Sequence, residues 1–411
     1  MIDINLVREK IEEVKSGVAK KGYDVSLVEK VLELDKKKRE LLEKVEKLRG
    51  ERNKYAKEKN VEEGKRVKLE LKQIEPDLAS AEREFEDLFF RFPNLPLEGV
   101  KTGKGEEENV VLRKWGEPRK ADFTMKDHLE IGKNLDILDF EAGAKVAGSQ
   151  FYFLKNDAVL LEQALIMFGM EILGNKGFKL ITTPDLAKSR YYLGTGYLPR
   201  GDEAQTYEIV NEDLGLIATS EVTIAGYHAD EVLRKQDLPL KYACLSHCFR
   251  QEAGAYGKYS KGLYRVHQFT KLEMFIYAHP LEAEKLHEEI VGIEEEIMQK
   301  LNIPYRIVDM CTGELGAIAA KKYDLEAWMP GRGDYGEVTS TSNTTDYQAR
   351  NLNIKYREGD RNEYVYMLNG TAIALSRIMI AILENYQNED GSVNVPEVLV
   401  KWMGKKRIQK A

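Results

Sequence analysis

The chain has 411 residues, of which 43% are hydrophobic, and this length predicts two or three globular domains instead of one. It has no run of about 18 uncharged apolar residues, and its start, MIDINLVREK, lacks the apolar core of a secretory signal. We therefore expect no membrane span and a cytoplasmic protein. Three cysteines, Cys244, Cys248 and Cys311, are too few for a disulfide framework.

The formal net charge of -7 gives no overall sign of nucleic-acid binding, but the charge is unevenly distributed. Residues 36–60 hold eleven Lys and Arg against five Glu, so this segment carries +6 and the rest of the chain -13. Most such runs are simply the solvated face of a helix. A basic helix is also what an RNA-binding arm requires.

Two apolar stripes with helical spacing dominate the first hundred residues. The first is broken only by Lys38 and Arg52, and it consists of Leu27, Val31, Leu34, Leu41, Val45, Leu48 and Tyr55. The second follows a predicted turn at Asn60–Gly64, and it consists of Val67, Leu71, Ile74, Leu78, Ala81, Phe85 and Leu88. Alternating steps of three and four residues on both sides of a short turn predict an antiparallel coiled-coil hairpin, whose second helix Pro76 should kink.

The chain changes character after the segment FPNLP, which ends the second helix. A stretch rich in Gly, Lys and Glu at 98–108 predicts a linker, so we expect a hairpin domain at 1–97, a linker segment at 98–125 and a main domain at 126–411. In the main domain, residues 157–173 predict a buried helix, KLITTPDL a strand that ends at Pro184, and residues 281–300 an amphipathic helix.

A pair of strands with a glycine-rich loop between them is predicted from LPLKYACLSHCFRQE, AGAYGKYSKG and YRVHQFTKLEMFIYA. The later stretch EYVYMLNGTAIALSRIMIAILENYQ predicts a strand, a glycine turn and a helix. Because strands and helices do not alternate strictly, we predict an α+β fold on an antiparallel sheet.

The sequence disfavours nucleotide binding by a P-loop or a Rossmann turn, because neither glycine motif occurs. The alternative is a site made of side chains on strands. In FRQE, Arg250 and Glu252 are two residues apart and should share one face of a strand. The arginine can bind a phosphate, the carboxylate can accept a hydrogen bond from an adenine amine, and Phe269 can stack on a base. An isolated R-x-E is usually a surface ion pair, but the neighbouring glycine-rich loop and HQF favour the nucleotide site.

A zinc site is a weaker interpretation of the segment CLSHC, which contains Cys244, His247 and Cys248. No second pair of ligands lies nearby, so buried strand residues are the favoured interpretation and no zinc is expected.

These stretches resemble motif 2 of class II aminoacyl-tRNA synthetases, and the chain as far as Leu399 resembles the bacterial-type seryl-tRNA synthetase family. The resemblance is carried by FRQEAG, GLYRVHQF, KLE, ITTPDL, ATSE, MCTGELG, AAKKYDLEAWMPGRGDYGEVTSTSNTTDYQAR, LNGTAIALSR and ILENYQNEDGSVNVPEVL. It implies a class II antiparallel sheet flanked by helices, an N-terminal hairpin that binds tRNA, and a homodimer with Pro184 near its interface.

The activity implied by the resemblance is that of a serine–tRNA ligase. Such an enzyme activates L-serine with ATP and Mg²⁺ to seryl-adenylate, releasing pyrophosphate, and transfers serine to the 3′ end of tRNA(Ser). The sequence leaves tRNA(Sec) open as a second acceptor, and no membrane partner is expected.

The resemblance also assigns residues position by position. Serine would be bound by Thr219, Ser220, Glu221, Glu273 and Thr371. ATP would be bound by Arg250, Gln251, Glu252, Val266, Phe269, Glu337, Val338, Thr339, Ser340 and Arg377. Arg250 and Arg377 would be the catalytic residues, and Glu337 and Ser340 would hold Mg²⁺ through ATP. Thr371 stands where many bacterial members have serine, which adds a methyl group to a small pocket.

The chemistry of serine activation agrees with these residue types. A pocket that rejects alanine and glycine needs polar groups that stay unpaired when the substrate hydroxyl is missing. Activation needs positioning and charge neutralisation, not an enzyme nucleophile. Two other interpretations are an amino acid:carrier-protein ligase and a non-catalytic adaptor or RNA-binding module. The long hairpin disfavours the first, and the presence of Arg250, Glu252, Glu337 and Arg377 disfavours the second.

Overall fold

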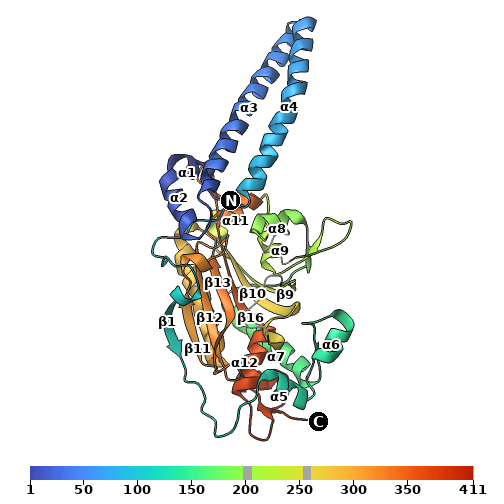
Figure 1. The fold of residues 1–411 in the computed structure, drawn as a ribbon, viewed down its shortest axis with the longest axis vertical. Coiled ribbons are helices and arrows are strands. Elements are labelled where there is room, and N and C mark those ends of the chain that lie inside the picture. Colours follow the sequence, from blue (N-terminus) through green and yellow to red (C-terminus); the bar gives the residue numbers. More distant parts are fainter. Residues whose placement is uncertain (198–205, 253–260, 411) are drawn as a thin grey trace. The chain divides into compact units, whose positions relative to one another are not determined.

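The computed structural model describes residues 1–197, 206–252 and 261–410. The chain divides into two compact units, Met1–Leu95 and Pro96–Ala411 (Figure 1). No helix in these described ranges is both long and apolar enough to cross a membrane.

The first unit confirms the predicted hairpin. Two short helices, α1 (Ile4–Glu9) and α2 (Ile11–Lys20), precede the long helices α3 (Ser26–Lys57) and α4 (Val61–Phe89). The two long helices pack through a seam of buried Val45, Val67, Leu71 and Leu78, with Leu41, Leu48, Tyr55 and Ile74 partly buried around them. Helix α4 is continuous through Pro76.

The predicted turn at Asn60–Gly64 is wrong at its C-terminal end. The connection covers only Glu58 to Asn60, and Gly64 lies in the first turn of α4. The reason is that Asn60 caps α4, because its side chain accepts a hydrogen bond from the backbone N–H of Glu63 at 3.3 Å.

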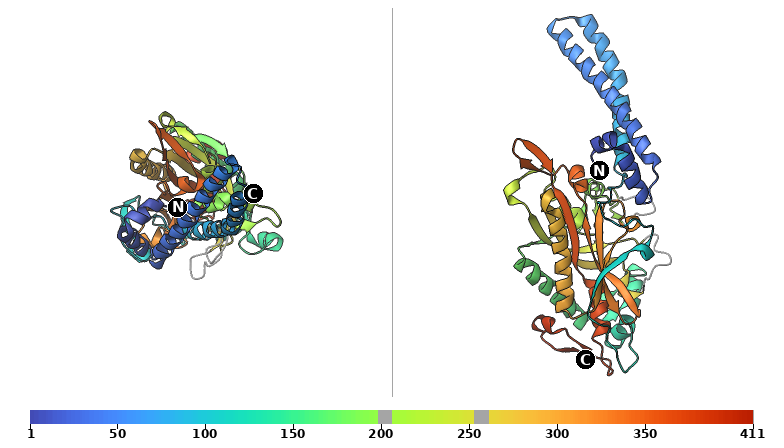
Figure 2. Two further views of the ribbon diagram at one scale, coloured as in Figure 1. Left: turned by 90° about the horizontal axis from the view of Figure 1, so that it is seen from above. Right: turned by 90° about the vertical axis from the view of Figure 1, so that its left-hand side faces the viewer.

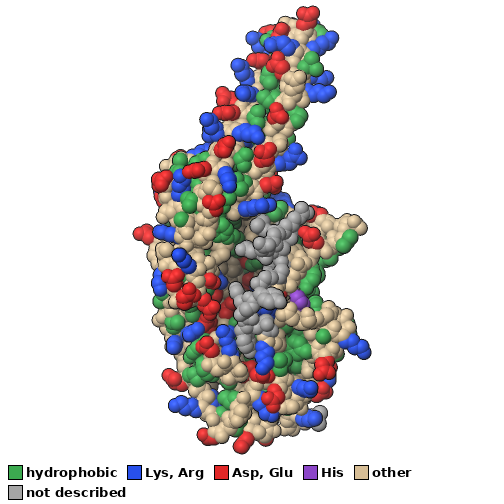
Figure 3. Space-filling model, in the orientation of Figure 1, with side chains coloured by type: hydrophobic (Ala, Val, Ile, Leu, Met, Phe, Trp, Pro, Cys, Tyr) green, Lys and Arg blue, Asp and Glu red, His purple; other side chains and the backbone are tan. Residues whose placement is uncertain are grey.

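The Lys and Arg side chains of α3 are exposed except for Lys38, whose Nζ packs over the Phe85 ring of α4 at 3.8 Å. Figure 3 shows blue Lys and Arg side chains along the hairpin, interspersed with acidic ones. Several of these cations are paired, for example Arg49 with Glu75 at 2.9 Å. In the C-terminal half of α3, five exposed cations make no ion pair within the described residues; they are Lys44, Lys47, Arg52, Lys54 and Lys57.

The second unit is built on an eight-stranded sheet in the order β1-β11-β12-β13-β16-β10-β9-β4. Every neighbouring pair is antiparallel except β4 and β9, so the predicted α+β fold on a mainly antiparallel sheet is confirmed. The strands are β1 (Val110–Trp115), β4 (Lys179–Thr182), β9 (Leu240–Phe249), β10 (Gln268–Ala278), β11 (Tyr305–Asp309), β12 (Lys321–Met329), β13 (Asp334–Asn343) and β16 (Tyr366–Ala374).

Smaller sheets and helices surround this sheet. The shorter strands are β2 (Leu138–Asp139), β3 (Phe153–Leu154), β5 (Leu186–Ala187), β6 (Tyr207–Glu208), β7 (Gly215–Leu216), β8 (Val232–Arg234), β14 (Lys355–Glu358), β15 (Arg361–Tyr364), β17 (Val393–Asn394) and β18 (Arg407–Ile408). The helices are α5 (His128–Asn134), α6 (Phe140–Ala147), α7 (Asp157–Asn175), α8 (Ser189–Thr195), α9 (Glu221–Ala225), α10 (Ala283–Lys300), α11 (Tyr347–Leu352), α12 (Leu375–Asn385) and α13 (Val400–Met403).

Helices α7 and α10 confirm two predicted helices and pack on the sheet, where α10 runs beside β13 and β16 (Figure 2). The main hydrophobic core lies between these helices, α12 and the sheet. The opposite face of the central strands does not pack against this core and carries polar side chains.

Three features of this unit differ from the sequence predictions. Strand β1 lies within the 98–125 segment and pairs with β11. Strand β9 ends at Phe249, so Arg250 and Glu252 follow the strand, and Glu252 has a left-handed φ of 51°.

The third difference is Gly370, which was expected in a turn but lies inside β16. A Cβ at this position would be 2.3 Å from Ile290 Cγ2 and 2.6 Å from Thr341 Oγ1. Glycine is therefore required there because α10 approaches the strand closely, and not because the chain reverses.

Candidate active site

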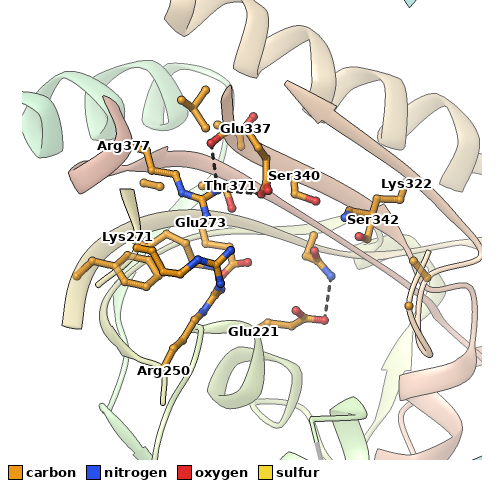
Figure 4. A pocket seen from close by; sticks show the side chains of 18 of the residues that line it. Glu221, Arg250, Lys271, Glu273, Lys322, Glu337, Ser340, Ser342, Thr371 and Arg377 are labelled. Carbon is orange, nitrogen blue, oxygen red and sulfur yellow. Dashed lines mark hydrogen bonds and ion pairs between the residues drawn. The ribbon is translucent and has the colours of Figure 1, made fainter. Parts of the chain in front are cut away.

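A cavity of about 310 Å³ opens on the polar face of the central strands (Figure 4). Its walls come from β10, β12, β13 and β16, from the residues that follow β9, and from the start of α12. The most prominent charged side chains in it are Glu221, Arg250, Lys271, Glu273, Lys322, Glu337 and Arg377.

Two β-bulges decide which side chains reach this cavity. On β13, Glu337 pairs with Glu326 while Thr339 pairs with Leu325, so Val338 is an extra residue. Strict alternation would turn Glu337 and Ser340 to opposite faces of the sheet, but the bulge brings both to the cavity.

The second bulge lies on β16, where Ala372 is the extra residue between Thr371 and Ile373. It allows Asn369 and Thr371, before the bulge, and Ala374, after it, to line the same cavity. Both bulges therefore interrupt central strands at the site itself.

A buried hydrogen-bond network around Glu273 forms one end of the cavity, hereafter the carboxylate end. Its Oε2 accepts hydrogen bonds from Thr219 Oγ1 at 2.5 Å and from Ser220 Oγ at 2.7 Å. Lys271 Nζ lies 2.8 Å from the same oxygen and donates to Thr219 Oγ1 at 2.6 Å. Burial would raise the pKa of Glu273, but the Lys271 charge and these hydrogen bonds hold the pKa below its ordinary value.

Two polar atoms at this end have no hydrogen-bond partner in the part of the chain that the structure describes. Glu273 Oε1 and Thr371 Oγ1 make no hydrogen bond within the described residues, although their side chains belong to residues only 2% and 8% exposed. Glu273 and Thr371 are directly opposite each other on β10 and β16. A small hydroxylated ligand between them would satisfy both groups.

Glu221 provides a second buried carboxylate at this end. Its Oε1 accepts hydrogen bonds from Gln348 Nε2 at 2.6 Å and Asn369 Nδ2 at 2.9 Å, and its Oε2 accepts one from Tyr197 OH at 2.9 Å. Burial and the neighbouring Glu273 charge raise the pKa of Glu221 to about 7. The carboxylate end thus holds one carboxylate with a lowered pKa, Glu273, and one with a raised pKa, Glu221.

Arginines and aromatic rings form the other end of the cavity, hereafter the arginine end. The Arg250 guanidinium lies 5.3 Å from the ring centre of Phe269. Within the described residues it makes one hydrogen bond, in which its Nε donates to Ala218 O at 3.3 Å. Both terminal nitrogens of Arg250 are thus available for an anion. Glu252 pairs with Arg265 at 2.5 Å beside Val266 in the cavity wall.

Arg377 lies on α12 at the same end of the cavity. Its Nη1 is 3.0 Å from both the Glu337 Oε1 and the Glu337 carbonyl oxygen, and its guanidinium lies 4.7 Å from the ring centre of Tyr264. Burial would raise the pKa of Glu337, but the charges of Arg377, Lys322 and Arg250 lower it. Glu337 is therefore an ionised carboxylate.

The residues expected to hold Mg²⁺ have suitable donors. Glu337 and Ser340 both line the cavity, and their side chains offer only oxygen atoms, the ligands that Mg²⁺ prefers. Within the described residues, no group of three or more His, Cys, Asp and Glu is arranged to hold a metal. A cation here would need further oxygens from a ligand, as Mg²⁺ has in nucleotide sites.

The structure brings most of the predicted residues together in this cavity. These are Glu221, Arg250, Glu252, Val266, Phe269, Glu273, Glu337, Val338, Thr339, Ser340, Thr371 and Arg377. Thr219 and Ser220 lie behind Glu273 and reach the cavity through it. Gln251 is not part of the wall, because its side chain donates to Thr206 O at 2.8 Å.

The sequence predictions missed Lys271, Tyr197 and Asn369, which line the cavity and bond its carboxylates. The alternation of strand residues could have revealed Lys271, two positions before Glu273. In the segment weighed as a zinc site, Cys244 and Cys248 are buried on one face of β9, whereas His247 is on the other face and bonds Asp185 at 2.8 Å.

The fold and cavity are those of a class II aminoacyl-tRNA synthetase. Residues 206–386 match the family described as the tRNA synthetase class II core domain (G, H, P, S and T). Residues 1–96 match the family described as the seryl-tRNA synthetase N-terminal domain.

Full-length relatives narrow this class to one family. The serine–tRNA ligase of Treponema denticola is 49% identical over 99% of this chain and 100% of its own length, and that of Dictyoglomus turgidum is 50% identical over 100% and 99%. The crystal structure of seryl-tRNA synthetase from Pyrococcus horikoshii complexed with ATP has a TM-score of 0.92 and 40% identity over the whole of both chains. The chain therefore belongs to the serine–tRNA ligase family.

Proposed function

We propose that this chain is a serine–tRNA ligase that forms seryl-adenylate from L-serine and ATP and transfers the serine to the 3′ end of tRNA(Ser). The observation that carries the proposal is a pair of polar atoms on residues that line the carboxylate end, Glu273 Oε1 and Thr371 Oγ1, which make no hydrogen bond within the described residues. The hydroxyl and the ammonium of serine can form hydrogen bonds with these two atoms. Alanine has no hydroxyl, so it would leave part of this hydrogen bonding unmade.

The two ends of the cavity suit the two halves of the activation step. The serine carboxylate attacks the α-phosphorus of ATP, forming the mixed anhydride and releasing pyrophosphate. Arg250 offers free donors for the α-phosphate and the serine carboxylate, Glu252 an acceptor for the adenine amine, and Val266 and Phe269 a surface for the base. Arg377 is held by Glu337 and Tyr264 and would bind the γ-phosphate.

Magnesium is part of this proposal. Bound with ATP beside Glu337 and Ser340, Mg²⁺ supplies neutralisation of phosphate charge during activation. Glu337 keeps its negative charge because its pKa is lowered by the nearby cations.

The hairpin is the proposed tRNA arm. The support is the five exposed cations in the C-terminal half of α3 that make no ion pair within the described residues, since they can neutralise RNA phosphates without first breaking protein contacts. We also propose that the hairpin domain ends at residue 97 and the linker segment at residue 125. A cytoplasmic location is part of the same proposal. Whether tRNA(Sec) is a second acceptor is to be tested.

We further propose a homodimer, formed on the side of the sheet that ends in β4. Large apolar side chains are exposed on the neighbouring elements β3, α7 and β4, namely Phe153, Val159, Leu160, Met167 and Leu180. Solvent-exposed apolar groups of this number on adjacent elements favour a protein interface. Light scattering should give twice the chain mass, and Leu160→Glu with Met167→Glu should give a monomer. Leu281→Glu, at an apolar residue 90% exposed elsewhere, is the control.

The activity is tested by ATP–pyrophosphate exchange with each common amino acid. We expect exchange with serine, and at least about a hundredfold less with alanine or glycine, because both lack the hydroxyl that the pocket reads. Comparable exchange with alanine would overturn the pocket assignment. Charging of tRNA(Ser) and tRNA(Sec) transcripts then defines the acceptors.

A further inference from the structure

A buried His–Glu pair lies beside the arginine end and has no role in the activity derived so far. His128 begins α5 and Glu384 lies on α12, and their side chains are 0% and 1% exposed. His128 Nδ1 is 2.9 Å from Glu384 Oε1, which also accepts the backbone N–H of His128 at 2.9 Å. Glu384 Oε2 accepts the backbone N–H of Gly331 at 2.8 Å.

The other ring nitrogen of His128 accepts a hydrogen bond from the main chain. His128 Nε2 lies 3.2 Å from the backbone N–H of Leu263, which can only donate. The proton of a neutral imidazole must therefore sit on Nδ1, where it is donated to Glu384. The carboxylate thus fixes the tautomer that Leu263 requires.

The geometry around Gly262 shows how closely the histidine holds this segment. Gly262 has a left-handed φ of 57°, and a Cβ there would lie 2.2 Å from His128 Nε2. Next to it, Lys261 forms an ion pair with Asp127, the residue before His128. Residues 261–263 are thus joined to the N-terminus of α5 by an ion pair, a hydrogen bond and a close backbone approach.

The segment held in this way continues directly into the arginine end. Tyr264 follows Leu263, its ring faces the Arg377 guanidinium, and its carbonyl oxygen accepts a hydrogen bond from Arg377 Nε at 3.3 Å. The next residue, Arg265, forms an ion pair with Glu252, and both Arg265 and Val266 line the cavity. A shift of Leu263 would move these groups together.

We propose that His128 and Glu384 are positioning residues that fix the segment 261–264 and, through Tyr264, hold Arg377 in place for ATP. The inference rests on the proposed function in taking the arginine end as the ATP site. It assigns the pair an effect on ATP, because the contacts of the pair lead through Leu263 and Tyr264 to Arg377 at the arginine end.

Two substitutions separate the two hydrogen bonds of the histidine. His128→Gln places an acceptor near the position of Nε2 and can keep the Leu263 contact. His128→Asn places its amide near Nδ1, so it can bond Glu384 but leaves the Leu263 N–H without an acceptor. His228→Asn is the matched control, because His228 also bonds two partners, Glu231 at 2.7 Å and Tyr242 at 2.8 Å, away from the cavity.

The experiment measures KM for ATP and for serine by pyrophosphate exchange, and the affinity for α,β-methylene ATP by calorimetry. We expect His128→Asn to raise the KM for ATP and to weaken the analogue about tenfold, the loss that an unsatisfied buried donor produces, with the KM for serine within about twofold. His128→Gln should recover most of the ATP affinity, and His228→Asn should leave both constants unchanged.

The proposal is overturned if His128→Asn leaves ATP affinity unchanged, or if it raises both KM values alike. Should this variant not fold, Tyr264→Leu must give the same rise specific to ATP, and a normal KM there overturns the proposal equally. A wild-type protein that binds the analogue without serine-dependent exchange would refute the proposed function. The affinity of the variants for the analogue, measured by calorimetry, would still test whether His128 and Glu384 position the ATP site. A wild-type protein that does not bind the analogue refutes both.

Discussion

The hairpin and the catalytic unit use charged side chains in opposite ways. In the C-terminal half of α3 the cations are exposed, and five of them have no ion pair within the described residues. In the cavity the charged groups are buried or partly buried and are held by neighbours, as Glu273 is by Lys271. Binding to RNA phosphates needs many weak contacts, whereas selecting a small substrate needs a few groups held rigidly. Changes in the cavity should therefore have large effects on activation, and changes on the hairpin graded effects on tRNA.

Arg250→Ala should have the largest effect. It removes the unpaired donors at the arginine end, so kcat/KM for serine-dependent exchange should fall about a thousandfold. Arg234→Ala is the matched control, because Arg234 is an exposed arginine paired with Asp237 and distant from the cavity wall. Near-normal exchange by Arg250→Ala would remove the basis for the ATP site.

Deletion of residues 30–90, with the gap closed by a short flexible linker, should have the second-largest effect. We expect exchange to stay within about threefold of wild type, while kcat/KM for tRNA charging falls about a hundredfold, because the phosphate contacts are lost. Full charging by the deleted protein at low tRNA concentration would instead make the hairpin a structural or protein-binding element.

Lys271→Met should have a smaller effect that depends on pH. Glu273 now has a lowered pKa, so it is ionised throughout the neutral range. Without the Lys271 charge, burial raises the pKa of Glu273, and protonation as the pH falls should remove the acceptor for serine. The acidic limb of the KM profile for serine should therefore move to higher pH, with about a tenfold rise at pH 6 and the KM for ATP unchanged. An unshifted profile would contradict the role of Lys271.

Reversal of single hairpin charges should have the smallest effect. Lys47→Glu or Lys54→Glu should weaken tRNA charging only a few-fold each at low salt, and this loss should shrink as salt rises because the contact is screened. Lys37→Glu is a useful comparison, since Lys37 is already paired with Glu84 at 3.4 Å. Equal losses at all salt concentrations would indicate damage to the helix instead of lost phosphate contacts.

Periodic features of the sequence predicted the framework of both units. The apolar stripes gave the hairpin because its two helices bury them against each other, as Val45 and Leu71 show. The strand pair β9 and β10 followed from alternation and from the glycine-rich stretch between them, whose residues 253–260 lie outside the described residues. In both cases the pattern that predicts the structure lies within one short, continuous stretch of the sequence.

The site itself depends on features without such a signal. The bulges at Val338 and Ala372 depend on partner strands far away in the sequence, so alternation alone would have separated Glu337 from Ser340. Gly370 suggested a turn because its real constraint, the approach of Ile290 on α10, is not local. The resemblance named twelve residues that line this cavity, although Arg250 and Glu252 reach it from beyond the end of their strand.

The exposed strand β4 has a thermodynamic consequence. Among the described residues it is the last strand of the large sheet and pairs there with β9 alone, and it carries Leu180 with half of its surface exposed. If a second copy covers this edge as proposed, unfolding is coupled to dissociation, and mass action makes the melting temperature rise with protein concentration. Diluted samples would then lose stability without any change in sequence, and the stabilities of variants can be compared only at one concentration of chains.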